Sequence, residues 1–378
     1  MGQAVTRVRT AAPWVACALA LAAVAPGAEP AGAPARAAAL RDHVHAVMKA
    51  HGVPGASVAV LRDFEIEWAN GFGVASLDGG RPVDTLTVFQ AASISKAVTA
   101  LAVLRLVAQG RLDLNQDVNA YLTSWKVPTN EHTTGTPLTL RHILSHTGGL
   151  TVGGFSGYAA GAALPTVPQL LDGMRPANHE AVRVVTVPGT RFEYSGGGTT
   201  IAQLVLTDQL SLPFPEVMRR LVLEPVGMRF STFEQPLPAD LAPFASAGHE
   251  GGKAVAGGSH TYPEMAAAGL WTTASDLARF VVAIQRSRLG LRGAVLPKDL
   301  ADQMTAPVLP DSFGLGFERF PKDEAERPLF GHTGGNKGYR SWLLASRDTG
   351  DGIVVLTNAD QWDAVREIAL RARVVYGW

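Results

Sequence analysis

Ser93 and Lys96 form the residue pair whose types and spacing most directly indicate chemistry. They stand three positions apart, as Ser93-Ile-Ser-Lys96, where the apolar run 97–108 begins. On a helix, side chains three positions apart lie on one face, one turn from each other. An amine held against a hydroxyl can make that hydroxyl a nucleophile. Because serine often opens helices and lysine is common everywhere, the four residues alone do not separate a catalytic pair from an ordinary helix start.

Ser93, and not Ser95, is the expected nucleophile of this pair. Ser95 is adjacent to Lys96 in the sequence and therefore lies off the helix face that carries the amine. Ser93 stands at the start of the predicted helix 93–109 and gains from the positive end of the helix dipole. This helix is apolar nearly all round, so we expect it to be buried at the centre of a domain.

Two later segments carry further candidate residues. Glu193-Tyr-Ser-Gly-Gly-Gly198 places Tyr194 beside three glycines, which we interpret as a tight turn and not as a nucleotide-binding loop. His-Thr-Gly-Gly occurs twice, at 146–149 and at 332–335, and only the second copy leads into a predicted strand. We therefore interpret His146 as a structural turn residue. Spacing alone does not bring either segment to Ser93.

The predicted elements suit an α+β fold in which one antiparallel sheet is flanked by helices and joined by a mainly helical lobe. An N-terminal hairpin and C-terminal strands would form the sheet, and the middle of the chain reads mostly as helices and loops. We expect an α/β lobe over about 36–110 and 286–378 and a helical lobe over about 111–285, all within one domain at 36–378. The expected elements are helix 40–49, strands 55–62 and 64–69 with a turn at Arg62-Asp63, a short helix that Thr139 caps and that ends at 148–149, helices 200–210 and 214–223, a capping box at 273–276, strands 341–346 and 353–358, and helix 362–375.

Composition excludes several classes of function. The 378 residues are 47% hydrophobic and 17% charged with a formal net charge of zero, which is typical of a globular protein. The sequence has no basic patch, so nucleic acid is not an expected partner. Cys17 is the single cysteine and lies in the N-terminal segment, so a disulfide framework, a thiol nucleophile and a cysteine-based zinc site are excluded from the mature chain. No cofactor is expected.

The N-terminal segment has the layout of a secretory signal peptide. Arg7 and Arg9 give a positive start, residues 11–25 are apolar and rich in alanine, and small residues follow up to Ala35. The apolar stretch is short for a membrane span, which disfavours the alternative of an uncleaved anchor. We expect a signal peptide and linker over residues 1–35, with the linker-like composition continuing to residue 37, and a secreted or periplasmic mature protein without a stable membrane span.

Three motifs in this order resemble the signatures of one enzyme superfamily. They are 89–96 (FQAASISK), 140–150 (LRHILSHTGGL) and 332–335 (HTGG). Together they are similar to the serine β-lactamase and penicillin-binding protein superfamily, in its class C-like branch, over roughly residues 40–375. The resemblance implies a β-lactamase/transpeptidase-like fold and a serine hydrolase of the esterase, D-amino-acid peptidase or β-lactamase type. No G-x-S-x-G element occurs, which argues against an α/β-hydrolase.

The resemblance implies a role for each matching residue. Ser93 would attack the substrate carbonyl and be acylated, Lys96 would help to take its proton, and Tyr194 would carry the proton to the leaving group. The third motif would line the substrate cleft with His332, Thr333, Gly334 and Gly335. The oxyanion hole would consist of the backbone N–H groups of Ser93 and Gly335, which are already oriented for the charge that develops.

Two positions depart from the family pattern. Gly196 stands where the second motif often has an asparagine that helps to hold a substrate amide, so its absence leaves room for ester substrates. His332 stands where β-lactamases often have lysine. We hypothesise that activity on carboxylate-bearing substrates falls as His332 deprotonates near its reference pKa of about 6.5.

The sequence therefore predicts an exported serine hydrolase that cleaves small esters, amides or peptides through an acyl-enzyme. The alternative is a non-catalytic penicillin-binding-like protein that binds cell-wall peptide fragments. The intact set of Ser93, Lys96 and Tyr194 disfavours that alternative, because a decayed site tends to lose one member. The sequence leaves the natural substrate and the oligomeric state open.

Overall fold

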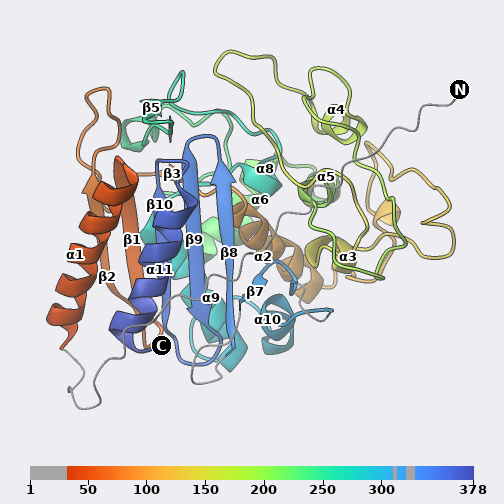
Figure 1. Cartoon of the computed structure of the whole chain (residues 1–378). Coiled ribbons are helices and arrows are strands. Elements are labelled where there is room, and N and C mark those ends of the chain that lie inside the picture. The colour runs from red at the N-terminus through yellow and green to blue at the C-terminus, as the bar shows by residue number, and fades with distance from the viewer. Residues whose placement is uncertain (1–31, 310–312, 321–327) are drawn as a thin grey trace, which may run out of the picture.

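The fold is built on a six-stranded antiparallel sheet in the order β2-β1-β10-β9-β8-β7 (Figure 1). The structure is a computed structural model that describes residues 32–309, 313–320 and 328–378. The N-terminal hairpin pairs with the C-terminal strands through β1 and β10, as the sequence predicts, and the α+β fold class is confirmed. The strands are β1 Gly55–Arg62, β2 Glu65–Gly73, β7 Glu318–Phe320, β8 Leu329–Asn336, β9 Tyr339–Ser346 and β10 Gly352–Thr357.

Helices cover both faces of this sheet. Helices α1 (Ala33–His51) and α11 (Trp362–Tyr376) lie side by side on one face (Figure 1), where Val58 and Val355 from the strands join their core. On the other face, α9 (Ala274–Leu289) packs against β1, β2 and β10. Because both faces are covered, β1 is buried at every position except its last.

Helix α2 (Ile94–Ala108) lies at the centre of the molecule. All its residues from Ile94 to Leu104 are buried, as the apolar sequence predicts, and it contacts α5, α8 and β8. The remaining elements are α3 Leu140–Leu144, α4 Val167–Asp172, α5 Gly196–Leu210, α6 Phe214–Met218, α7 Glu224–Val226, α8 Met265–Ala268, α10 Lys298–Thr305, the 3-10 turns η1 Val118–Ala120 and η3 Ala242–Phe244, the π-helical turn η2 Arg219–Leu223, and the short strands β3 Phe89–Gln90, β4 His249–Glu250, β5 Lys253–Ala254 and β6 Trp271–Thr272. Within the described residues no helix is long and apolar enough to cross a bilayer.

Several element boundaries differ from the predicted ones. The hairpin turn lies at Asp63 and Phe64, both with left-handed φ, so β2 begins at residue 65. Helix α3 ends at Leu144, well before 148–149, because His146 is left-handed with φ 55°. The glycines 196–198 form the first helical turn of α5, so the prediction of a tight turn there is wrong.

Two of the predicted bounds fall inside helices. Helix α1 begins at Ala33, inside the stretch 26–37 expected to be a linker, and most of the predicted signal peptide lies outside the described residues. The boundary expected at residue 285 divides α9, which packs on the sheet and therefore belongs with the α/β lobe.

The predicted capping box at the start of α9 is only half formed. Thr273 accepts a hydrogen bond from the N–H of Asp276 at 3.1 Å, but the Asp276 carboxylate does not return one. It accepts instead from the N–H of Phe230 at 2.7 Å, the hydroxyl of Ser231 at 2.8 Å and the guanidinium of Arg279 at 2.6 Å. This fully buried carboxylate thus joins α9 to the segment that follows α7.

We expect Asp276→Ala to lower the free energy of unfolding by about 2 to 3 kcal/mol, because the buried N–H of residue 230 loses its acceptor. Urea unfolding measures the change. Asp299→Ala, which removes an exposed acidic residue from the first turn of α10, is the matched control and should stay within about 0.5 kcal/mol of the unchanged chain. Equal effects of the two substitutions would contradict this account of the α9 cap.

Candidate active site

Ser93 occupies the N-cap of α2, at the end of a tightly held turn. Ala92 before it has a left-handed φ of 50°, a strained conformation that non-glycine residues rarely adopt and that recurs at functional sites. Ser95 donates to the Ala92 carbonyl at 2.5 Å and accepts from the N–H of Leu270 at 3.0 Å. Ser95 therefore secures the turn and takes no part in the amine contact, as expected.

Lys96 makes the contact that the spacing predicts. Its Nζ donates to Ser93 Oγ at 3.0 Å and to the Ala267 carbonyl of α8 at 2.8 Å. The side chain is only 3% exposed, and burial lowers the pKa of Lys96 to about 7. A substantial fraction of this amine is therefore neutral at physiological pH and able to accept a proton from Ser93.

Tyr194 lies within reach of the same pair. The Lys96 Nζ is 5.1 Å from the centre of the Tyr194 ring. Burial raises the pKa of Tyr194, the Ser93 hydroxyl opposes that shift, and the charge of Glu318 adds to it, so the phenol keeps its proton at neutral pH. Burial also raises the pKa of the half-buried Glu318 carboxyl, to about 7. Sequence reasoning missed this neighbour of the site, which no motif marks.

The His146 ring packs against the Tyr194 ring. Its ring centre lies 4.3 Å from that of Tyr194, and its Nδ1 accepts a hydrogen bond from the N–H of Ser195 at 3.2 Å. Burial, with smaller contributions from the charges of Lys96 and His332, lowers the pKa of His146 well below its usual range, so Nδ1 is free of a proton and can accept. The left-handed φ of 55° at His146 fits the expected turn residue, and its structural role stays a prediction. Its place against Tyr194 was missed, although the repeated His-Thr-Gly-Gly marked it.

Strand β8 brings the third motif against Ser93. A Cβ at Gly334 would lie 3.1 Å from the Ser93 nitrogen and 2.3 Å from the Ala91 carbonyl oxygen, so only glycine permits this approach. Strand β7 pairs with β8 only as far as Gly331. Within the described residues, the outer edge of β8 therefore faces no strand beyond that point, and Gly334 borders the nucleophile. The oxyanion role of Gly335 stays a prediction.

His332 does not behave as the sequence hypothesis requires. Its ring is buried, its Nδ1–H donates to the Thr333 carbonyl at 2.6 Å, and its ring centre lies 6.2 Å from that of Tyr194. Burial, aided by the charge of Lys96, lowers the pKa of His332 to about 3. The hypothesis of a titration near 6.5 is therefore wrong, because the imidazole stays neutral from pH 5 to 8. Thr333 pairs with Trp342 on β9, on the face of the sheet that His332 does not share.

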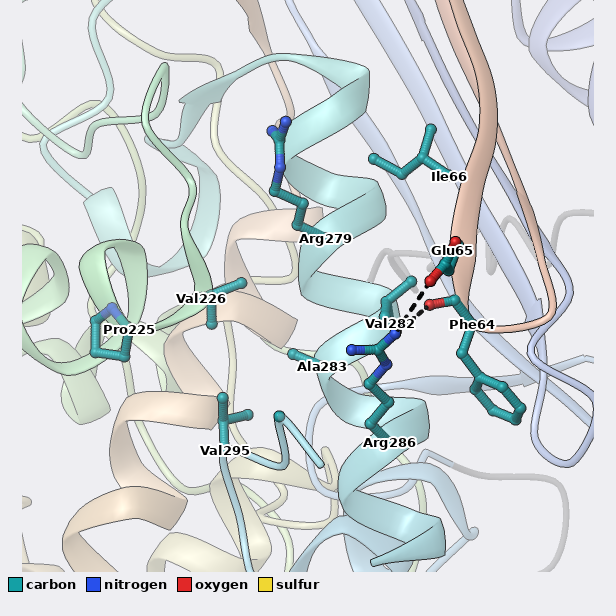
Figure 2. A pocket seen from close by; sticks show the side chains of 11 residues that line it. Phe64, Glu65, Ile66, Pro225, Val226, Arg279, Val282, Ala283, Arg286 and Val295 are labelled. Carbon is teal, nitrogen blue, oxygen red and sulfur yellow. Dashed lines mark hydrogen bonds and ion pairs between the residues drawn. The ribbon is translucent and has the colours of Figure 1, made fainter. Parts of the chain in front are cut away.

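A groove of about 490 Å³ lies between α9, α7 and the β1–β2 turn (Figure 2), and none of the candidate catalytic residues lines it. Its two guanidinium groups are already engaged, that of Arg279 by Asp276 and that of Arg286 by the Phe64 carbonyl at 3.1 Å. No group of three or more potential metal ligands occurs in the described parts of the chain. The catalytic side chains therefore define the candidate site.

Curated relatives match about half of this chain. Esterase EstB of Burkholderia gladioli is 29% identical over 197 residues, which are 50% of this chain and 49% of that esterase. The chain spans about half, or less, of the length of the curated relatives it matches.

Solved structures share the fold at low sequence identity. A penicillin-binding protein homologue from Pyrococcus abyssi, described as octameric, has a TM-score of 0.74 at 23% identity over 90% of this chain and 77% of that chain. A class C beta-lactamase has a TM-score of 0.69 at 19% identity over 90% of this chain and 96% of its own. The sequence also matches the beta-lactamase family over residues 40–376. Because that match covers most of the chain, this protein belongs to the beta-lactamase family.

Proposed function

We propose that this protein is an exported serine hydrolase that cleaves small esters, and more slowly small amides, through an acyl-enzyme on Ser93. The observation that carries the proposal is the 3.0 Å contact between Lys96 Nζ and Ser93 Oγ, made by an amine whose pKa burial lowers to about 7. Export rests on the signal-like composition of the N-terminal segment.

Acylation uses the neutral form of Lys96. Ser93 Oγ attacks the substrate carbonyl carbon while its proton passes to the Lys96 amine, and backbone N–H groups at Ser93 and Gly335 bind the oxyanion. The C–O bond to the leaving alcohol then breaks as Tyr194 gives its proton to that alcohol and is reprotonated from Lys96. A water molecule repeats the sequence on the acyl-enzyme, which releases the carboxylic acid and restores Ser93.

Three observations favour esters over amides. Gly196 offers no side chain to hold a substrate amide, and the neutral His332 offers no charge to hold a substrate carboxylate. The relative from Burkholderia gladioli carries the name esterase. A non-catalytic binding protein remains the second candidate, but the retained hydrogen bond from Lys96 to Ser93 disfavours it.

We expect Ser93→Ala to lower kcat/KM for a p-nitrophenyl ester by a factor of about 10⁴ or more, because the nucleophile is gone. It should also prevent covalent labelling by an activated alkyl phosphonate, as seen by intact-protein mass spectrometry. Ser275→Ala on α9 is the control and should keep both properties. Turnover that survives in Ser93→Ala would refute the proposal, and an unlabelled, inactive but ligand-binding parent chain would favour the binding protein.

We expect kcat/KM for a neutral ester to rise with pH and to level off with an apparent pKa of about 7, because protonated Lys96 cannot act as the base. A neutral ester has no carboxylate for a protonated His332 to bind, so this substrate isolates the titration of the base. Since Glu318 also titrates near 7, the profile should be repeated with Glu318→Gln. The rise should persist in that variant, and its disappearance would transfer the titration from the lysine to the carboxyl.

We expect Lys96→Met to stabilise the protein at pH 7 while it removes activity. Burial lowers the pKa of Lys96 from 10.5 to about 7, and at about 1.4 kcal/mol per pH unit this sets a ceiling of about 5 kcal/mol on the cost. The lost hydrogen bonds to Ser93 and Ala267 reduce the gain to about 1 to 3 kcal/mol.

The sign of the pH dependence separates this explanation from better packing. The unfolded chain binds the Lys96 proton more tightly than the folded chain does, so the parent gains stability as pH rises from 7 towards 10.5. The advantage of Lys96→Met, measured by urea unfolding, should shrink between pH 7 and pH 9.5. A constant difference over this range would contradict an electrostatic origin.

A further inference from the structure

Gly196 is a glycine for reasons of space. It begins α5 without the left-handed φ that would require glycine, in a helical position where glycine is about 0.5–1 kcal/mol less stable than alanine. A Cβ there would lie 2.7 Å from Cε2 of Phe155 and 3.2 Å from the Gly153 carbonyl oxygen. The Phe155 ring thus occupies the space that the Cβ of any other residue at position 196 would need.

Phe155 is held in that place by a histidine. The Phe155 ring meets the ring of His179 edge to face, with 5.0 Å between their centres. His179 Nδ1–H donates to the Glu180 carbonyl at 2.8 Å, and His179 Nε2 lies 3.5 Å from a carboxylate oxygen of Glu264. The hydrogen bond of Nδ1 therefore orients the imidazole against Phe155, and Nε2 faces the Glu264 carboxylate.

Glu264 is the buried acidic neighbour of His179. Its side chain is fully buried, and within the described residues neither carboxylate oxygen makes a hydrogen bond that meets normal geometry. A buried carboxylate needs a partner of opposite charge, and the imidazolium of His179 is the group in ion-pair range. Burial lowers the pKa of His179, but the nearby Glu264 carboxylate and the hydrogen bond to the Glu180 carbonyl outweigh this effect and leave the pKa raised.

Glu264 also belongs to the catalytic scaffold. It is the N-cap residue of α8, the helix whose Ala267 carbonyl accepts from Lys96. Helix α8 thus orients the Lys96 amine through the Ala267 carbonyl. Through Glu264 and His179 it also positions the Phe155 ring, which lies against Gly196, two residues after Tyr194 in the sequence. Phe155 itself is only half-buried.

We infer that Phe155, supported by the His179–Glu264 pair, is a specificity-determining residue that selects esters with an apolar acyl group over substrates with an amide in the acyl group. The inference rests on the proposed acyl-enzyme chemistry at Ser93 and adds the class of acyl group. An apolar ring edge cannot satisfy the N–H and C=O of a desolvated amide, whereas it packs against an alkyl chain.

A matched pair of esters tests this inference without a change of leaving group. The p-nitrophenyl esters of butyric acid and N-acetylglycine differ in the acyl group, and the measured quantity is the ratio of their kcat/KM values. We expect the parent chain to favour the butyrate. Phe155→Ala and His179→Ala should each lower this preference, by about tenfold for Phe155→Ala, since one contact of this kind contributes about that factor.

Restoring an amide-binding side chain gives the sharper result. Gly196→Asn alone should reduce turnover of both esters, because the new Cβ collides with the Phe155 ring. Phe155→Ala combined with Gly196→Asn should shift the ratio towards the N-acetylglycinate by about tenfold or more beyond Phe155→Ala alone. Phe64→Ala, a phenylalanine removed from the remote groove, is the control and should leave the ratio unchanged.

Titration of Ser93 with the phosphonate separates the two possible failures. If the parent chain takes no label and turns over neither ester, the proposed function falls, and this inference falls with it. If Ser93 is labelled but Phe155→Ala and the double variant keep the parent ratio, Phe155 does not set specificity and only this inference is overturned. Should the double variant not fold, the ratio in Phe155→Ala and His179→Ala decides.

Discussion

The burial of the Lys96 amine is the constraint on which the rest of this site depends. An ammonium group removed from water is unstable unless its surroundings compensate, and here a serine hydroxyl and the carbonyl of Ala267 are the atoms that receive its hydrogen bonds. The short helix α8 positions that carbonyl. The neutral state of His146 and of His332 follows from the same burial, because a second positive charge beside Lys96 would be costly.

Three side chains near Lys96, those of Tyr194, His146 and His332, are uncharged at neutral pH. Burial also raises the pKa of the nearby Glu318 carboxyl to about 7. The glycines that border the site follow from close packing and not from turns. Gly334 lets β8 touch the nucleophile, and Gly196 lets an aromatic ring rest on α5. The two glycines therefore shape the site as much as the side chains around it do, because each permits a close contact that a Cβ would prevent.

Sequence reasoning reached the fold and the principal residues because their signals are local or shared with a family. The apolar run of α2 predicts its burial, and the spacing of Ser93 and Lys96 predicts their contact. The pKa of His332 and the place of His146 against Tyr194 could not be predicted, because both depend on which distant segments cover them. The helical start of α5 at Gly196 was missed for the same reason: glycine is a poor helix former, and the distant Phe155 ring and Gly153 carbonyl explain its presence.

The pairing of β1 with β10 has a consequence for how the protein comes into being. It closes the sheet between the two ends of the domain, and the third motif on β8 reaches Ser93 only once the last strands are in place. Contacts this far apart in sequence form late, because the loop that they close is long. Ser93 therefore lies beside β8 only after the last strands have paired. The complete arrangement of Ser93, Lys96 and Gly334 is a property of the finished fold and not of any one segment.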